Sequence, residues 1–460
     1  MSKGKIWFAL AVLFAINLLN FYDRLILGAV REPLRKEWNL SDTELSLLGT
    51  TFLLLYASVG IPLGRWADRG NRTRILTIGV TAWSILTSLS GFARSFWQMA
   101  GLRLTVGVGE ATCAPAANSL IGDLFPAQTR ARAMSIFMLG LPIGNAACLF
   151  FSGMLAKAYG WPAAFYVAVI PGLLCAVGAS MIHEPMRGAT EAHNIGARKR
   201  DGSPYALVLS IPTMRWLIAA GALHNFIMYA IGGFLATYVI RFHGQNVQYA
   251  GWVSMAVYGL AGIPGMVLGG IFGDIIYRRR RSGRLLLAAC AMLLASPALY
   301  LALSQPQGHW GLFALFFGFG CMMMYTYYAT VYSAIQDVIE PSLRATAMAL
   351  YFCAMYAFGG AAGDPTIGFL SDHYAHAAAV QEGVALEGLD GVQLQQALEP
   401  FRAEGLNKAM YALPVVALLL AGSLFAGART ITADIDNLQR WMRESTEGEA
   451  TAAPREKVAT

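Results

Sequence analysis

The chain has 460 residues, of which 56% are hydrophobic and 13% are charged. Ordinary soluble domains carry about 25% charged residues, so this composition excludes a typical soluble protein and predicts a polytopic α-helical membrane protein. The net charge of +7 does not indicate nucleic-acid binding, because a basic excess in an apolar chain is typical of lysines and arginines kept in cytoplasmic loops.

Apolar runs bounded by charged residues predict twelve membrane crossings of about 20 residues or more. They lie at residues 6–30, 45–63, 75–93, 96–122, 133–156, 161–182, 216–240, 248–273, 285–304, 310–336, 345–371 and 409–427. We expect an all-α fold of two six-helix bundles related by pseudo-two-fold symmetry. The predicted parts are an N-terminal bundle (1–182), a polar cytoplasmic linker (183–215), a C-terminal bundle (216–427) and a cytoplasmic tail (428–460).

The distribution of basic residues predicts the orientation of these crossings. With both termini in the cytoplasm, 24 of the 34 lysines and arginines lie on the cytoplasmic side and 8 on the other. The positive-inside rule therefore predicts cytoplasmic termini. No role is assigned to the outer segment 372–408 or to the tail.

Two sequence patterns occur once in each half of the chain. Asp123-x6-Arg130-Ala-x-Ala-Met134 recurs as Asp337-x6-Arg344-Ala-x-Ala-Met348, and Gly64-x3-Asp68 recurs as Gly270-x3-Asp274. Internal repeats in a protein with twelve crossings are typical of secondary transporters, in which two similar bundles rock about a central site.

The repeated residues are predicted to act as a conformational switch. Asp68 is expected to accept hydrogen bonds from a neighbouring helix N-terminus, and Arg69 to pair with an acid such as Asp123. These contacts form on only one side of the rocking motion and therefore bias it. The predicted switch residues are Gly64, Asp68, Arg69, Asp123, Arg130, Asp274, Asp337 and Arg344.

Five charged residues lie inside predicted crossings: Asp23, Arg24, Arg103, Glu110 and Asp364. Each costs about 2.5–3.5 kcal/mol at the bilayer centre, so such residues are functional by default. Asp23 and Glu110 are predicted to bind and release protons, and Arg24 and Arg103 to hold an anionic substrate. The alternative for Asp23 and Arg103 is a static ion pair that locks the first bundle.

Further substrate contacts are predicted in the C-terminal bundle. His224 and Asn225 lie in the seventh crossing, and Tyr325 belongs to a Met- and Tyr-rich stretch of the tenth that suits an acyl chain. Packing inside the bundle is the alternative for all three.

Several other functions receive no support from the sequence. The chain has no G-x4-G-K-[ST] motif for ATP hydrolysis. Its six cysteines show no paired spacing, so neither disulfides nor a zinc site is predicted, and no metal or cofactor is expected. A membrane enzyme acting on lipids is a hypothesis of another class, but no histidine box or nucleophile-base spacing favours it.

The stretch Gly64-Arg-Trp-Ala-Asp68-Arg69-Gly-Asn-Arg72-Thr-Arg74 resembles the signature loop of the major facilitator superfamily. Within that superfamily, four segments resemble the spinster family of lipid transporters, particularly its bacterial members. They are Asn20-Phe-Tyr-Asp23-Arg24, Arg103-x3-Gly-Val-Gly-Glu110, Glu184-Pro-x-Arg-Gly188 and Gly363-Asp364 with the later Ser-Asp372. In this chain Asp364 runs directly into Pro365, so no role is carried over to it.

The resemblance implies a monomeric carrier in a bacterial inner membrane, with membrane lipids around it. Its implied substrates are lysophospholipids, sphingosine phosphate or related amphiphiles. The implied mechanism is alternating access with proton coupling through Asp23 and, from the reasoning above, Glu110. The alternative is a proton-coupled symporter of organic anions such as sugar acids or aromatic acids, a family that also resembles this chain around Asp23 and around Arg103.

Overall fold

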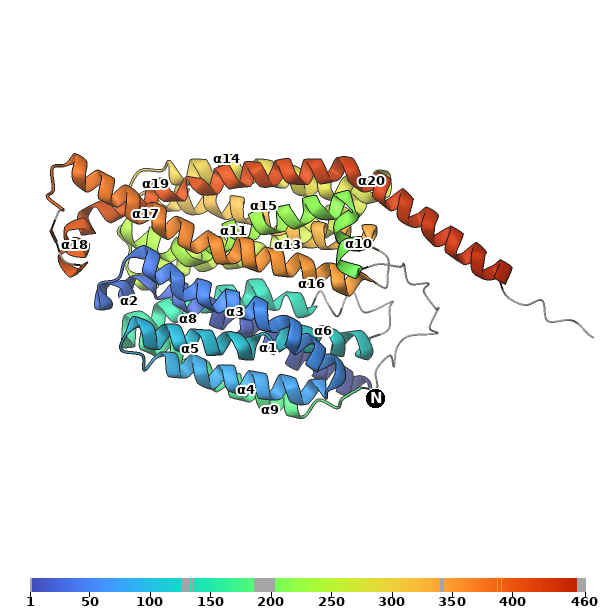
Figure 1. Cartoon of the computed structure of the whole chain (residues 1–460). Coiled ribbons are helices and arrows are strands. Elements are labelled where there is room, and N and C mark those ends of the chain that lie inside the picture. The colour runs from blue at the N-terminus through green and yellow to red at the C-terminus, as the bar shows by residue number, and fades with distance from the viewer. Residues whose placement is uncertain are drawn as a thin grey trace, which may run out of the picture.

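The computed structural model of the chain describes residues 2–125, 133, 136–185, 203–339, 343–386, 388–389 and 391–452. Regular structure within these residues is helical, and no strand occurs among them. The prediction of an all-α fold is confirmed. Figure 1 shows the helices packed side by side in an elongated bundle.

The helices of the first six crossings form one group, which we call the N half. They are α1 (Lys3–Ala29), α2 (Arg31–Trp38), α3 (Asp42–Arg69), α4 (Arg72–Ser90), α5 (Phe96–Glu110), α6 (Cys113–Leu124), α8 (Gly140–Tyr159) and α9 (Pro162–Ser180). Ser95 begins α5 as its N-cap, since its hydroxyl accepts from the backbone N–H of Gln98. The fourth crossing consists of α5 and α6 together.

The remaining helices form the C half. They are α10 (Pro204–Ser210), α11 (Pro212–Arg241), α12 (Val247–Ser254), η1 (Met255–Leu260), α13 (Gly262–Arg279), α14 (Gly283–Leu303), α15 (Trp310–Val338), α16 (Arg344–Ala354), η3 (Met355–Gly360), α17 (Ala361–Gln381), α18 (Gly391–Leu398), η4 (Glu399–Phe401), α19 (Arg402–Met410) and α20 (Ala412–Ala452). Within the predicted linker, α10 is described and residues 186–202 lie outside the described part of the chain.

Helices cover all twelve predicted crossings. In the described part of the chain, eight segments are long and apolar enough to span a membrane by length and composition. The other four crossings, formed by α3, by α4, by α5 with α6 and by α16 to α17, are interrupted or more polar. The helices of all four contribute charged side chains to the contacts described below.

The two ends of the bundle differ in the segments that they carry. The N-terminus and the projecting end of α20 lie at one end, which we call the terminal face (Figure 1). Helices α2, α18 and α19 lie at the opposite end, the distal face. The positive-inside prediction makes the terminal face cytoplasmic.

Two π-helical segments lie on the seam between the halves. Segment η1 packs against α8, and η3 packs against α3 and α11. Helices α1 and α11 also meet on this seam, where a Cβ at Gly28 would lie 2.4 Å from the carbonyl oxygen of Gly232. The glycine therefore allows the two backbones to touch.

The segment 372–408, treated above as an outer loop, is largely helical. Helix α17 continues to Gln381, and α18, η4 and α19 follow on the distal face. Helix α19 packs on α17 at Gly405, where a Cβ would lie 2.5 Å from the carbonyl oxygen of Ser371. Packing against α17 therefore holds this helical segment on the distal face.

The start of the predicted tail is a continuation of α20. The Asp434 carboxylate accepts hydrogen bonds from the backbone N–H of Thr213 at 2.9 Å and from its hydroxyl at 2.6 Å. These bonds cap the first turn of α11, so the first part of the tail is held against the C half.

Candidate functional site

Five polar side chains meet inside the N half and form a group that we call the N-half cluster. They are Asn20, Asp23 and Arg24 from α1 and Arg103 and Glu110 from α5. Asp23 and Arg103 are each 2% exposed, and Glu110 is fully buried. The structure therefore brings together the four charged residues that the sequence singled out in the first and fourth crossings.

Glu110 is the acceptor at the centre of the cluster. Its Oε2 lies 2.8 Å from Nε of Arg24 and 3.1 Å from Nδ2 of Asn20. Because Arg24 directly follows Asp23 on α1, the two side chains point about 100° apart. Arg24 reaches the seam between the halves, whereas Asp23 lies among helices of the N half.

Aromatic rings surround the Arg24 guanidinium at cation–π distances. Its Cζ lies 4.3 Å from the ring centre of Tyr56 and 5.9 Å from that of Tyr356. Two more rings lie within 5.7 Å, those of Phe21 and Phe52. Tyr356 belongs to η3 of the C half, so Arg24 is held by both halves at once.

Several buried polar atoms of the cluster have no hydrogen-bond partner among the described residues. They are Nε and Nη1 of Arg103, Nη1 of Arg24, Oδ1 of Asp23 and Oε1 of Glu110. Nη2 of Arg103 donates to the backbone oxygen of Asp23 at 3.4 Å, and no ion pair joins these two residues in the described part of the chain. The static pair considered above is therefore not observed.

The three residues predicted in the C half lie apart from this cluster. His224 is fully buried, with Nε2 at 3.1 Å from the Met324 carbonyl oxygen and its ring stacked at 4.0 Å on Tyr327. Asn225 donates to the Met355 carbonyl oxygen at 3.1 Å and so holds η3 against α11. Tyr325 is likewise fully buried. Their surroundings in this conformation are those of packing residues, and their contact with substrate stays a prediction.

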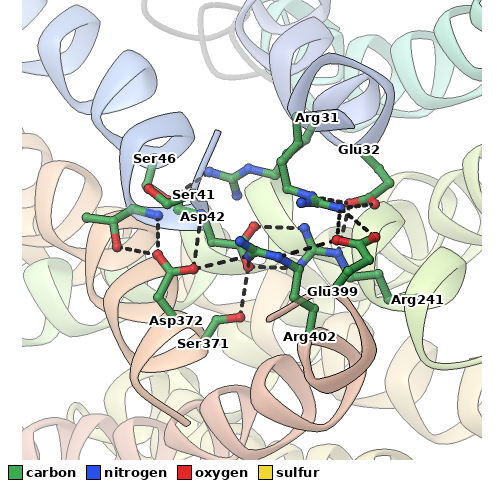
Figure 2. Close-up of polar contacts among 12 residues, drawn as sticks. Arg31, Glu32, Ser41, Asp42, Ser46, Arg241, Ser371, Asp372, Glu399 and Arg402 are labelled. Carbon is green, nitrogen blue, oxygen red and sulfur yellow. Dashed lines mark hydrogen bonds and ion pairs between the residues drawn. The ribbon is translucent and has the colours of Figure 1, made fainter. Parts of the chain in front are cut away.

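A second group of charges joins the two halves at the distal face, and we call it the distal network (Figure 2). Its N-half members are Arg31, Glu32, Arg35 and Asp42, and its C-half members are Arg241, Asp364, Asp372, Glu399 and Arg402. Every ion pair between described residues that joins the two halves lies in this network or between Glu399 and the neighbouring Lys36.

Arg241, at the end of α11, reaches two carboxylates of the N half. It binds Asp42 through two nitrogens at 2.7 and 2.8 Å and Glu32 through Nε at 2.8 Å. Asp42 also accepts from the Ser371 hydroxyl at 2.8 Å. Two-pronged guanidinium–carboxylate bonds are among the strongest polar contacts in proteins.

Three carboxylates of the C half bind the N half in return. Asp364 accepts from both terminal nitrogens of Arg31, at 2.9 and 3.1 Å. Glu399 accepts from Arg35 at 2.8 and 2.9 Å. The third, Asp372, accepts from backbone and side-chain donors at the start of α3. The distal face is therefore closed by reciprocal charges.

Glu32 of α2 and Asp42 at the start of α3 lie outside the predicted membrane crossings. The distal network keeps both carboxylates ionised. Burial opposes their charge, but several guanidinium groups together outweigh it and hold the pKa of both carboxyl groups below the usual range. Arg241 contributes most in both cases, with Arg35 beside Glu32 and with Arg402 and Arg31 beside Asp42. Closure of the distal face therefore relies on charges that persist at neutral pH.

The sequence repeat corresponds to a matching pair of contacts near the terminal face. In the N half, Arg72 binds Asp123, and its Nε lies 2.7 Å from Oε1 of Glu184. In the C half, Arg284 lies 2.6 Å from Asp337 and 2.7 Å from Asp274. In each half, an arginine near the start of the third crossing (α4 or α14) binds an acid near the end of the fourth crossing (α6 or α15).

The other predicted switch residues are only partly described. Gly64, Asp68 and Arg69 belong to α3, and Arg344 begins α16, but their side chains lie outside the described residues. Arg130 lies outside them altogether. The expected pairing of Arg69 with Asp123 stays a prediction, and the structure identifies Arg72 as one partner of that acid.

The distal network was missed by sequence reasoning. Its signal was present: Arg31, Glu32 and Arg35 lie in the segment between the first two crossings, on the side where the positive-inside rule expects few basic residues. Basic residues that occur on this side despite the rule indicate that they have acidic partners in the other half of the chain.

Comparisons with known proteins agree with this architecture. The sequence model of the Major Facilitator Superfamily matches residues 13–363. The chain is 29% identical over 377 residues to an MFS-type efflux pump of Mycolicibacterium smegmatis, across 80% of this chain and 85% of that protein. It is 30% identical over 387 residues to protein spinster homolog 1 of Xenopus laevis, across 78% of this chain and 72% of that protein.

Comparison with solved structures indicates the same family and fold. A bacterial homologue of the human lysosomal transporter spinster, in an inward-facing and unoccupied conformation, superposes with a TM-score of 0.83 at 27% identity. The match covers 94% of this chain and 99% of that one.

Proposed function

Because the chain belongs to the Major Facilitator Superfamily and within it to the spinster family, whose fold is that of a membrane transporter, we propose that it carries an amphipathic, anionic, lipid-like substrate. The proposed substrate is of the lysophospholipid or sphingolipid type. Transport is by alternating access and is coupled to protons.

The observation that carries this proposal is the set of unused donors on two buried arginines of the N-half cluster. Nε and Nη1 of Arg103 and Nη1 of Arg24 have no hydrogen-bond partner in the part of the chain that the structure describes. A buried charged donor without an acceptor costs free energy, and a phosphate or carboxylate headgroup supplies acceptors in the two-pronged geometry that guanidinium prefers. The headgroup is proposed to lie between these two side chains.

An aromatic surface leads from Arg24 into the C half and supports an amphipathic substrate. The rings of Tyr56 and Tyr356 lie 5.5 Å apart across the seam, and Phe352 lies 6.4 Å beyond Tyr356. Tyr332 follows at 5.7 Å. These four side chains are half-buried. All four offer an apolar face to an acyl chain, and the three tyrosines also offer hydroxyl groups to polar parts of the substrate.

The charge balance of the N-half cluster supports proton coupling. Two arginines and two carboxylates cancel when all four are ionised, so an anionic headgroup enters a site with no net charge. Protonation of Asp23 or Glu110 leaves the site with one positive charge and favours the anion. Substrate and proton therefore bind together more readily than either alone.

The distal network supports a conformation that is closed on one side. With the termini cytoplasmic, as the basic residues predict, the closed distal face is the outer one in a bacterial inner membrane. This agrees with the similarity to a relative captured facing inward.

A thermal-shift screen of the purified chain tests the proposal. The probes are an anionic lysophospholipid, sphingosine phosphate, a zwitterionic lysophospholipid, a sugar acid and an aromatic acid. A ligand that binds only the folded chain stabilises it by about 2.7 kcal/mol at 100 times its Kd. We expect the anionic lipids to raise the unfolding temperature. Stabilisation by the organic acids alone would favour the organic-anion symporter instead.

A further inference from the structure

Asp364 has no part in the N-half cluster, yet it forms a largely enclosed ion pair between the halves. Both of its carboxylate oxygens accept from Arg31, at 2.9 and 3.1 Å. The Arg31 side chain is 3% exposed and that of Asp364 is 14% exposed. The arginine belongs to α2 of the N half and the carboxylate to α17 of the C half.

The C half encloses the Arg31 guanidinium on two sides. Its Cζ lies 3.8 Å from the centre of the Phe234 ring on α11, a distance at which cation–π attraction is strong. At Gly233, a Cβ would lie 2.1 Å from Oδ1 of Asp364, so the glycine leaves room for the carboxylate against α11. The C half therefore forms a binding site for the Arg31 side chain.

Separation of the halves at the distal face removes Arg31 from this binding site. Asp364 then stays in the C half, beside Gly233 and Phe234, which carry no charge. A carboxylate that loses its cation next to an apolar wall is stabilised by taking up a proton. The gap opened by the separation supplies that proton from the distal side.

The other charges near Asp364 do not replace Arg31. From α3 the nearest charge is Asp42, which repels an ionised Asp364, and Ser46, Gly49 and Thr50 of the same helix are neutral. On α11 the next charge is Arg241, eight residues beyond Gly233 and so about 12 Å farther along the helix axis. Along α17 itself the next charge is Asp372, whose basic partner is Arg402 on α19.

We propose that Asp364 is a second proton-binding site of the transport cycle, at which a proton from the distal side and Arg31 of the N half bind in turn. The proton-bound form belongs to the distal-open state and the Arg31-bound form to the distal-closed state. This inference rests on the proposed alternating access, but it depends neither on the substrate nor on Asp23.

Distances between spin labels on the distal face test it. The full-length chain, reconstituted in liposomes without substrate, carries Arg94→Cys and Gln307→Cys. Both positions are exposed, in loops of opposite halves. Cys290, which is exposed, and Cys175 and Cys353, which are half-buried, are replaced by serine. Double electron–electron resonance then measures the open and closed populations between pH 8 and pH 5.

In the otherwise native chain, the open population is expected to rise as the pH falls. Asp364→Asn should raise the ratio of open to closed forms at pH 8 by roughly tenfold or more and make it independent of pH. Asp372→Asn is the matched control, because it also removes a carboxylate that bridges the halves. This variant should open the face but keep the pH dependence.

Three results would overturn the proposal: no pH dependence in the native chain, an unchanged pH dependence in Asp364→Asn, or an equal loss of pH dependence in Asp372→Asn. Should Asp364→Asn not fold, Arg31→Gln serves instead. It removes the cation that competes with the proton, so it must open the distal face at pH 8 and weaken the dependence of opening on pH. Because no substrate is present, these results stand whether or not anionic lipids prove to be the cargo.

Discussion

The carboxylate of Asp372 caps the first turn of α3 from the opposite half of the molecule. It accepts from the backbone N–H of Thr43 at 2.9 Å and from the Thr43 hydroxyl at 2.7 Å. Ser41 and Glu44 form a capping box at the same helix end, and together they satisfy the backbone N–H groups of both residues. The backbone N–H of Thr43 donates instead to Asp372 of the C half. This hydrogen bond at the start of α3 joins the two halves and breaks when they separate.

Removal of this cap should open the distal face. For Asp372→Ala we expect the balance to move toward the open form by about 1–2 kcal/mol, the usual cost of a lost helix cap. Spin labels at positions 94 and 307 measure the change. Glu404→Gln is the control, since Glu404 lies on α19 but pairs with Lys408 of its own half at 2.7 Å. An equal effect of both variants would contradict a specific role for the cap.

Arg103→Ala should impair recognition of charge. The variant removes two of the three unused donors of the N-half cluster, so binding of an anionic lysolipid is expected to weaken by tenfold or more, in line with about 1.5–3 kcal/mol for bonds to charged groups. A zwitterionic lysolipid should lose less affinity. Titration of both lipids against the purified variant checks this, and an equal loss for both would assign Arg103 to the scaffold.

Asp23→Asn should uncouple transport from protons. The amide keeps the size of the side chain but cannot take up a proton, so accumulation driven by a pH gradient should disappear. Exchange of labelled for unlabelled substrate across proteoliposomes should continue, because it requires no net proton movement. Gradient-driven accumulation at the native level would eliminate Asp23 as a coupling site.

Arg72→Met should destabilise the N half. Its guanidinium is 1% exposed and binds Asp123 and Glu184, and removal of one partner from a buried ion pair costs about 3–5 kcal/mol. Asp123 and Glu184 are 16% and 24% exposed, so solvent reduces the loss, and about 2 kcal/mol is expected. Thermal unfolding in detergent measures it. Arg74→Met, at an exposed position two residues away, is the control and should change little.

Closure of the distal face by Glu32 and Asp42 should be insensitive to pH near neutrality. Both carboxyl groups have a lowered pKa in the closed form, so their contribution is complete above the ordinary carboxyl pKa of about 4. It is lost only as the pH falls below that value toward the lowered pKa. In Asp364→Asn, distances across the distal face should therefore stay constant from pH 8 to pH 5. Opening within that range would show that other groups titrate there.

Several features of this protein were predictable from the sequence because they depend on local composition. An apolar run long enough to cross a bilayer reports a helix by itself, and charges such as Asp23, Arg24, Arg103 and Glu110 stand out because hydrocarbon penalises them. The repeat of Asp123 as Asp337 indicated two related halves, and the structure gives both acids an arginine partner.

Other features depend on contacts between segments far apart in the chain, and only the tertiary structure decides them. Arg31 and Asp364 are separated by 333 positions, and no local pattern links them. Their pairing exists because α2 and α17 meet at the distal face in this conformation. Burial there, away from water, makes each charge require a partner from the opposite half. The same packing places the helices of residues 391–410 on the distal face, where Glu399 and Arg402 reach partners in the N half.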